Sequence, residues 1–300
     1  MKSLVKAALW LCLLGCLYYA YFVQVINTYH HTVYSWLLSH WSTISNYSHG
    51  PLIPLIALGL VWWKHQELKA AVVKPVTAGA GIVVLAMLTY YLGVKGGQER
   101  LTVISFIVLL YGLSMTFCGR EVSRVLFFPI AFLLLMIPLN FLDEQVGFPL
   151  RIMVAEASTS LLNWLGIATT RNGTAIYSSV FRFDVADPCS GIRSLMALST
   201  VTAAYAYVTQ RAQWKRWVLF LSAMPLAVLG NMARVTSIAL VAHVYGQELA
   251  SKAYHECSGY IVFSVALTAM VVFGLLLNFP YRRIWENWMK PPEQPRGEHE

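Results

Sequence analysis

Long apolar stretches alternate with short polar segments along this chain, and several stretches reach the roughly 20 residues that a helix needs to cross a bilayer. We expect about eight membrane-spanning helices. Their predicted ranges are 7–26, 51–63, 76–94, 101–117, 125–142, 191–209, 217–245 and 258–279. The pattern therefore predicts an all-α, polytopic membrane helical bundle.

Composition agrees with this fold class. Hydrophobic residues make up 57% of the chain and charged residues 12%, with a mean hydropathy of +0.57, whereas a soluble domain carries about 25% charged residues. The first apolar stretch lacks an Ala-x-Ala cleavage site, so we expect an uncleaved first span. We predict one transmembrane domain over 1–285 and a proline-rich, disordered cytoplasmic tail over 286–300.

The distribution of positive charge predicts the orientation. Of the 22 Lys and Arg residues, fourteen fall in the loops on the side of the two termini, seven on the other side, and Arg234 inside a span. Cytoplasmic loops carry the excess of Lys and Arg, so both termini should be cytoplasmic. The net charge of +8 then reflects orientation and not nucleic-acid binding.

Two exported segments hold residues that could serve a site. The loop over 27–50 ends in Tyr47-Ser48-His49-Gly50, where His49 is the one residue that could reach a site. Between 143 and 190, the pattern over 150–165 predicts a helix lying on the outer surface. The aromatic and β-branched stretch over 175–185 predicts a short extended pair or hairpin just before Cys189.

Cys189 lies where a polar stretch becomes an apolar helix, in Asp187-Pro188-Cys189-Ser190-Gly191-Ile192-Arg193. Unpaired backbone N–H groups and the positive end of the helix dipole would face its sulfur and favour the thiolate. Arg193 adds positive charge, and Gly191 lets a substrate backbone approach closely. A structural cysteine is the alternative interpretation.

Arg234 is unusual because its surroundings are nearly uncharged. An arginine inside a span costs at least about 2.5–3.5 kcal/mol, so it should face the bundle interior and have a partner. It lies 17 residues after Trp217, or about 25 Å along a helix, in the outer half of the bilayer. Asn231 shares its face. The alternative is a buried ion pair with Asp184 or Asp187.

His255 lies where the last exported loop enters the final span, a common place for a solvated histidine. The predicted topology nevertheless puts Cys189, Arg234 and His255 at one membrane face. A cysteine and a histidine suffice as nucleophile and base, and a cationic group can stabilise the oxyanion. The three residues together favour a membrane cysteine protease or transpeptidase.

At these residues the chain resembles the exosortase/archaeosortase family of polytopic membrane cysteine transpeptidases, from about Tyr47 to Phe263. The resemblance is carried by three blocks, which are Tyr47-Ser48-His49-Gly50 with Pro54, Cys189-Ser190-Gly191-Ile192-Arg193-Ser194-Leu195, and Asn231 and Arg234 with His255, Gly259, Tyr260 and Phe263. Asp187-Pro188 stands where an alanine is common, and Tyr260 where a tryptophan is often found. Neither departure touches the three candidate catalytic residues.

The resemblance implies that Cys189 attacks a peptide bond near a C-terminal sorting signal, that His255 acts as base and acid, and that Arg234 holds the oxyanion. The supporting or substrate-binding residues would be Ser190, Gly191, Arg193, Asn231 and His49. Substrates would be exported proteins of the PEP-CTERM kind, often made alongside exopolysaccharide genes. The enzyme would lie in the bacterial inner membrane, in contact with lipid and with its site on the periplasmic side. It would need neither cofactor nor metal and bind no nucleic acid.

Three alternatives keep the membrane prediction. The charged groups could line a transporter path, although they cluster at one face and the spans lack paired broken helices. The protein could be a scaffold with a Cys189–Cys257 disulfide, since the exported side is oxidising. Cys189, His255 and Cys257 could also bind a metal, but their spacing is a weak signal.

Overall fold

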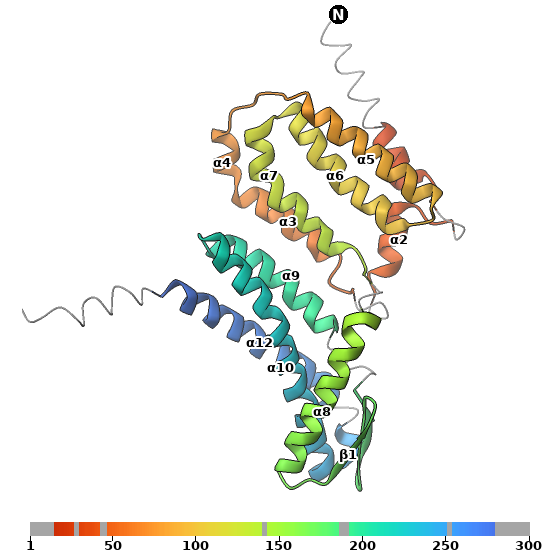
Figure 1. The fold of residues 1–300 in the computed structure, drawn as a ribbon, viewed down its shortest axis with the longest axis vertical. Helices are drawn as coiled ribbons and strands as arrows, with labels where there is room; N and C mark the ends of the chain where they lie inside the picture. Colours follow the sequence, from red (N-terminus) through yellow and green to blue (C-terminus); the bar gives the residue numbers. More distant parts are fainter. Residues whose placement is uncertain are drawn as a thin grey trace, which may run out of the picture.

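Figure 1 shows the computed structural model, which describes residues 15–26, 30–42, 47–139, 143–185, 192–250 and 254–279. The helices α2 to α7 lie together in the upper part of the view, and α8 to α12 lie below them with a small sheet. The predicted helical membrane architecture is therefore confirmed in outline. The predicted tail over 286–300 lies outside the described residues, and the single domain over 1–285 stays a prediction.

The first group runs from a π-helical turn (η1) to a 3-10 turn (η2). Its elements are η1 (Tyr19–Val23), α2 (Val33–His40), α3 (Leu52–Trp63), α4 (His65–Ala70), α5 (Ala78–Lys95), α6 (Glu99–Phe117), α7 (Arg120–Phe132) and η2 (Leu133–Met136). A capping box starts α2, because the Thr32 hydroxyl accepts from the Ser35 N–H at 3.1 Å while the Ser35 hydroxyl accepts from the Thr32 N–H at 2.8 Å.

Small residues allow α5 and α6 to pack closely. A Cβ atom added to Gly79 would lie 2.4 Å from the backbone nitrogen of Thr116, and one added to Gly112 would lie 3.0 Å from that of Val83. Neither position has room for a side chain, so glycine lets the two backbones approach, as small residues do between membrane helices.

The second group holds the segments that carry the candidate catalytic residues. Its elements are the π-helical turn η3 (Asp143–Gly147), α8 (Phe148–Trp164), β1 (Thr169–Asn172), β2 (Ala175–Ser178), β3 (Arg182–Asp184), α9 (Ile192–Thr209), α10 (Gln213–Tyr245), α11 (Gln247–Leu249) and α12 (His255–Asn278). The three strands form an antiparallel sheet in the order β1-β2-β3. The expected hairpin is confirmed, and β1 adds a strand to it.

Within the part of the chain that the structure describes, four helices are long and apolar enough to cross a membrane, namely Ala78–Lys95, Glu99–Phe117, Gln213–Tyr245 and Cys257–Asn278, and Leu52–Trp63 is a shorter apolar helix. The chain is therefore a polytopic membrane protein. The expected span over 125–142 appears instead as α7, which contains Pro129, followed by a 3-10 turn. Helix α9 covers residues 192–209 of the expected span 191–209, but it is not among these four helices. A total of eight spans stays a prediction.

Helix α10 organises the second group. With 33 residues it is about 50 Å long, which exceeds the roughly 30 Å of a hydrocarbon core. Helix α8 packs against its C-terminal half, and the sheet packs against α8. One hydrophobic cluster includes all three, with Val154, Ala155 and Leu162 from α8, Ile176 from β2, Val185 after β3, and Val235, Ile238, Ala239 and Ala242 from α10. The predicted helix over 150–165 is thus confirmed, and its place on the membrane surface stays a prediction.

Tyr207 of α9 joins the two groups. Its ring stacks on Phe128 of α7 at 3.8 Å between centroids and meets Trp63 of α3 edge-on at 6.0 Å. Two cations lie over the same ring, with Lys64 Nζ 5.6 Å and Arg216 Cζ 4.9 Å from its centroid. This aromatic contact therefore connects elements from both halves of the sequence.

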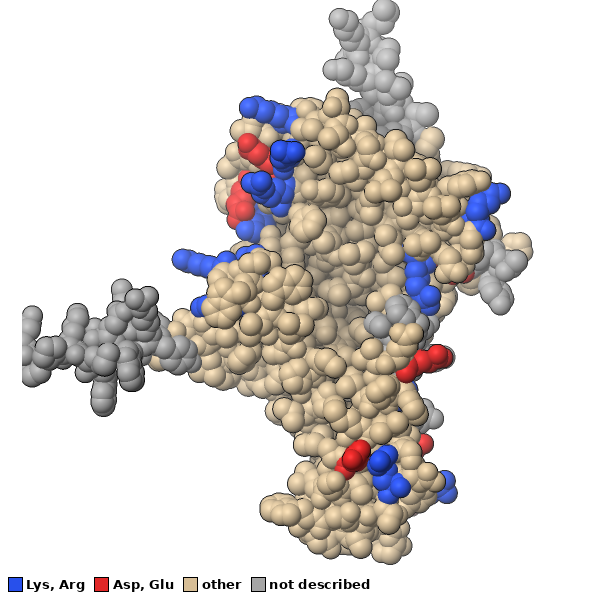
Figure 2. Space-filling view, in the orientation of Figure 1, with Lys and Arg blue, Asp and Glu red and all other residues tan. Residues whose placement is uncertain are grey.

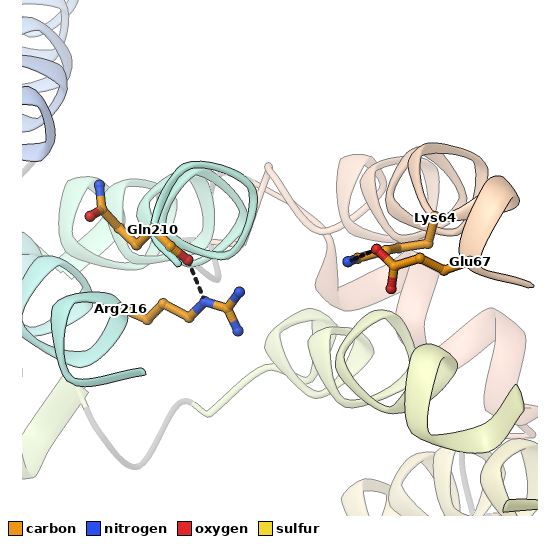
Figure 3. A network of polar contacts seen from close by, with 4 residues as sticks. All are labelled: Lys64, Glu67, Gln210 and Arg216. Atoms are coloured by element: carbon orange, nitrogen blue, oxygen red, sulfur yellow. Dashed lines mark hydrogen bonds and ion pairs between the residues drawn. The ribbon is translucent and has the colours of Figure 1, made fainter. Parts of the chain in front are cut away.

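Polar contacts surround that junction. Figure 3 shows Arg216 donating from Nε to the backbone oxygen of Gln210, 2.8 Å away, in the second group of helices, and Lys64 paired with Glu67 in the first group, on the facing side. Figure 2 shows Lys and Arg side chains gathered around this end of the molecule, near α4 and the start of α7. Several of the described loops that were predicted to share one side of the membrane thus lie at one end.

Candidate functional site

The structure describes the three candidate catalytic residues to different extents. Arg234 is described in full, within α10. His255 is the first residue of α12, and only its backbone is described. Cys189, Ser190 and Gly191 fall in the segment 186–191, outside the described residues. Of the three, Arg234 is therefore the residue whose side-chain contacts the structure gives.

The side chain of Arg234 extends from α10 toward α12. Its Nε donates a hydrogen bond of 3.2 Å to the hydroxyl of Ser258, whose exposed fraction is 1%. Ser258 lies three residues after His255, so this contact falls one turn into α12. As predicted from the cost of burying its charge, Arg234 is half-buried and has a polar partner.

Gly259 lies against the guanidinium of Arg234. A Cβ atom added to Gly259 would lie 3.3 Å from Nη2 and 3.4 Å from Cζ of the arginine. One turn earlier in α10, a Cβ on Gly230 would lie 3.1 Å from Cγ1 of Val262. Glycines at both contacts keep α10 and α12 close together where the charged group crosses between them.

A small cavity of about 30 Å³ opens beside this contact. Three helices line it, with Ser194 from α9, Asn231 and Arg234 from α10, and Gly259 and Phe263 from α12. Such a volume is enough for a water molecule, which needs roughly 10–15 Å³ and polar partners. The first turn of α9, which follows the Cys189 segment, therefore meets the same space as Arg234.

Asn231 shares this face of α10, as the sequence predicts. Its exposed fraction is 5%, and it also lines a smaller neighbouring cavity with Arg151 of α8 and Leu195 of α9. Arg193 and Ser194 are half-buried in the first turn of α9. The supporting roles proposed for Asn231 and Arg193 stay predictions.

Asp184, one of the two partners considered for Arg234, accepts a hydrogen bond of 2.6 Å from the hydroxyl of Thr174, which fixes it within the sheet. Asp187, the other, lies outside the described residues. Cys257 and Cys16 are free, exposed thiols, and Cys118 is a free, half-buried thiol. The alternative with a Cys189–Cys257 disulfide therefore finds no support at Cys257.

His49 lies apart from these contacts, three residues before the start of α3. Its ring stacks on Tyr47 at 5.5 Å between centroids, and both of its ring nitrogens are buried without a hydrogen-bond partner among the described residues. Burial lowers the pKa of His49 from its ordinary value of 6.5. A direct role of His49 at the site stays a prediction.

The surroundings of His49 are held by hydrogen bonds to the segment after η2. The Tyr47 hydroxyl accepts from the Leu139 N–H at 2.9 Å, and Trp41 Nε1 donates to the Met136 oxygen at 3.0 Å. Arg100 Nε donates to the Pro138 oxygen at 2.9 Å. Burial raises the pKa of Tyr47, and Arg100 partly offsets this effect. These bonds join the loop before α3 and the start of α6 to residues 136–139, at and just after the end of η2.

Ser258 is the residue of this site that sequence analysis missed. A serine in an apolar helix carries little information by itself, because it commonly bonds to its own backbone. The available signal is its position, one turn after His255 and next to Gly259. Among the described residues, no three His, Cys, Asp or Glu side chains gather as a metal site would require.

Comparison with known proteins identifies the family. The family model described as transmembrane exosortase (Exosortase_EpsH) matches residues 41–272. The chain belongs to the transmembrane exosortase family. No curated protein and no solved structure matches it. Membership of the exosortase family implies a membrane sorting enzyme that acts on PEP-CTERM proteins, and the matched region includes Cys189, Arg234 and His255.

Proposed function

We propose that this exosortase is a membrane-embedded cysteine transpeptidase in which Cys189 is the nucleophile, His255 the general base and acid, and Arg234 the oxyanion-stabilising group. Its substrates are exported proteins with a C-terminal PEP-CTERM-like sorting signal. The observation that carries the proposal is the buried polar contact of Arg234 with Ser258, one turn after His255. This contact fixes a guanidinium close to the helix that carries the proposed base.

The chemistry follows from these three groups. His255 takes the thiol proton, and the Cys189 thiolate attacks the carbonyl carbon of the peptide bond. Negative charge then develops on the carbonyl oxygen, where the Arg234 guanidinium stabilises it. The imidazolium gives its proton to the departing amine, and a thioester remains on Cys189. An acceptor nucleophile loses a proton to His255, attacks the thioester and releases the thiolate.

Ser194 provides the connection to the nucleophile. It is five residues after Cys189 in sequence and lines the same cavity as Arg234. The start of an apolar helix also supplies backbone N–H groups that favour a thiolate. We therefore place the reacting carbonyl near the point where α9, α10 and α12 meet.

The proposal includes an orientation. Eight spans would place both termini in the cytoplasm and the site on the periplasmic side of the bacterial inner membrane. The gathering of Lys and Arg around the ends of α3, α4 and α7 supports this, because cytoplasmic loops carry the excess of positive charge. Helix α8 and the sheet would then lie outside the bilayer, beside the protruding half of α10.

Co-expression with a tagged PEP-CTERM protein tests the function. Cys189→Ala and His255→Ala should insert and fold but leave the substrate as uncleaved precursor on a blot. Cys257→Ser is the matched control, because it removes an exposed exported thiol and should process normally. Normal processing by Cys189→Ala would exclude this residue as the nucleophile. Equal loss in Cys189→Ala and Cys257→Ser would favour the disulfide-linked scaffold.

A further inference from the structure

We infer that Ser258 and Gly259 are positioning residues that set the orientation of the Arg234 guanidinium for catalysis. This inference rests on the proposed function and assigns a task to two residues outside the proposed nucleophile, base and oxyanion groups. Neither residue is expected to touch the reacting atoms. Both would act through Arg234, by holding it at one place on α12.

The hydrogen bond supplies the first part of the argument. An arginine side chain has several rotatable bonds, so burial alone does not fix the direction of its planar end. The bond from Arg234 Nε to the Ser258 hydroxyl, 3.2 Å long, fixes one edge of that plane. Because Ser258 is almost fully buried, little water is available to replace the hydroxyl as acceptor.

Gly259 supplies the second part. A Cβ at this position would lie 3.3 Å from Nη2 and 3.4 Å from Cζ, with Nη1 at 3.8 Å. The face of α12 at Gly259 thus lies directly against the guanidinium. An added methyl group would move the guanidinium by a few tenths of an ångström without removing its charge. A displacement on that scale matters for a group that must meet a developing oxyanion.

The position along α12 supplies the third part. Ser258 and Gly259 follow His255 by three and four residues, within the next turn of the same helix. A rigid helix therefore fixes the Ser258 hydroxyl, which holds the Arg234 side chain, relative to the backbone of the proposed base His255. This arrangement couples two groups that come from different helices and that must act on one carbonyl.

Four variants of the full-length, membrane-reconstituted protein test the inference on a PEP-CTERM substrate. Ser258→Ala removes the acceptor, Ser258→Thr keeps a hydroxyl, and Gly259→Ala keeps the bond but displaces the guanidinium. Thr236→Val is the matched control, because the Thr236 hydroxyl is also buried in this region but has no partner among the described residues. Each variant is measured for kcat, KM and thermal stability.

We expect Ser258→Ala to lower kcat roughly 10- to 100-fold, as loss of a hydrogen bond to a charged group would. KM should stay close to that of the parent protein, and the melting temperature should fall by only a few degrees, as for the loss of one hydrogen bond. Ser258→Thr should recover most of the rate, and Gly259→Ala should also lower kcat. Thr236→Val should change neither kcat nor KM.

Two results would overturn the inference. One is an unchanged kcat in both Ser258→Ala and Gly259→Ala. The other is a loss of rate that follows the loss of folded protein, which indicates a packing role only. Cys189→Ala separates this failure from failure of the proposed function. An inactive Cys189→Ala with an active Ser258→Ala rejects the positioning role alone, whereas an active Cys189→Ala rejects the nucleophile assignment itself.

Discussion

Arg234 Nε and the Ser258 hydroxyl are joined by a hydrogen bond of 3.2 Å that connects α10 to the first turns of α12. Both residues lie within apolar helices, where an unpaired guanidinium would be costly. The bond gives this guanidinium a polar partner on α12. It also fixes a cationic group at Ser258, one turn along α12 from His255.

Replacement of Arg234 by lysine should be severe. Lysine keeps the positive charge but lacks the planar fork and the Nε donor. We expect substrate processing to fall by about 10²- to 10³-fold, the usual cost of losing one oxyanion-stabilising donor. Precursor and product can be followed by pulse–chase labelling.

Arg171→Lys is the matched control for that substitution. Arg171 is in β1 and pairs with the exposed Glu156 at 3.6 Å, and exposed ion pairs of this kind contribute little. Processing at the parent rate by Arg234→Lys, with Arg171→Lys equally active, would remove the oxyanion role from Arg234.

The buried imidazole of His49 predicts a pH-dependent stability. Burial lowers its pKa in the folded protein below the ordinary value of 6.5, so the unfolded chain binds the proton more readily. The folded state should be fully stable above about pH 6.5 and lose stability as the pH falls through the lowered pKa. Thermal unfolding in detergent between about pH 5 and 8 measures this loss.

His49→Phe should reduce that loss, because phenylalanine keeps a ring beside Tyr47 and cannot take up a proton. The melting temperature of His49→Phe should therefore change less between high and low pH than that of the parent protein. Parallel curves for parent and variant over the whole range would show that another group causes the pH dependence.

Tyr47→Phe should destabilise the protein by about 1 kcal/mol. The substitution keeps the ring but removes the acceptor of the Leu139 N–H. Tyr34→Phe provides a control, because Tyr34 has an exposed fraction of 48%. Denaturation of the two variants in the same detergent gives the comparison. Equal stabilities would indicate that the Leu139 N–H finds another acceptor without cost.

Tyr207 should stabilise the contact between the two groups of helices through its ring. Tyr207→Ala loses the stack on Phe128 and the surface beneath Lys64 and Arg216, and we expect a loss of at least about 2 kcal/mol. Tyr207→Phe keeps the ring and should lose less than about 1 kcal/mol. The melting temperatures of Tyr207→Ala and Tyr207→Phe are compared. Similar values for the two variants would show that the ring contributes little.

The length and apolarity of each run allowed most of the helices to be predicted from sequence. The run over 101–117 appears as α6 and that over 217–245 as α10. In a bilayer, the backbone N–H and C=O groups of such a run must bond to one another, and a helix satisfies them within the segment. The run over 125–142 did not form one helix. Pro129 lies inside α7 and removes a backbone donor from that helix. A 3-10 turn over Leu133–Met136 then follows α7.

Other features depend on tertiary contacts that no local pattern specifies. Strand β1, Thr169–Asn172, is polar and mostly exposed, and it is a strand because it pairs with β2. The burial of Arg234 follows from the cost of its charge, but its partner does not. Ser258 became apparent only when α10 and α12 were packed together, since hydroxyl groups in apolar helices are common and usually bond locally.

The most direct test of this account is the mass of the Cys189 peptide after rapid acid quenching of the reconstituted protein with a PEP-CTERM substrate. The account predicts a substrate fragment joined to Cys189 through a thioester, released by hydroxylamine and absent from Cys257. Substrate cleavage at the normal rate without any adduct on Cys189, or with the adduct on Cys257, would contradict it.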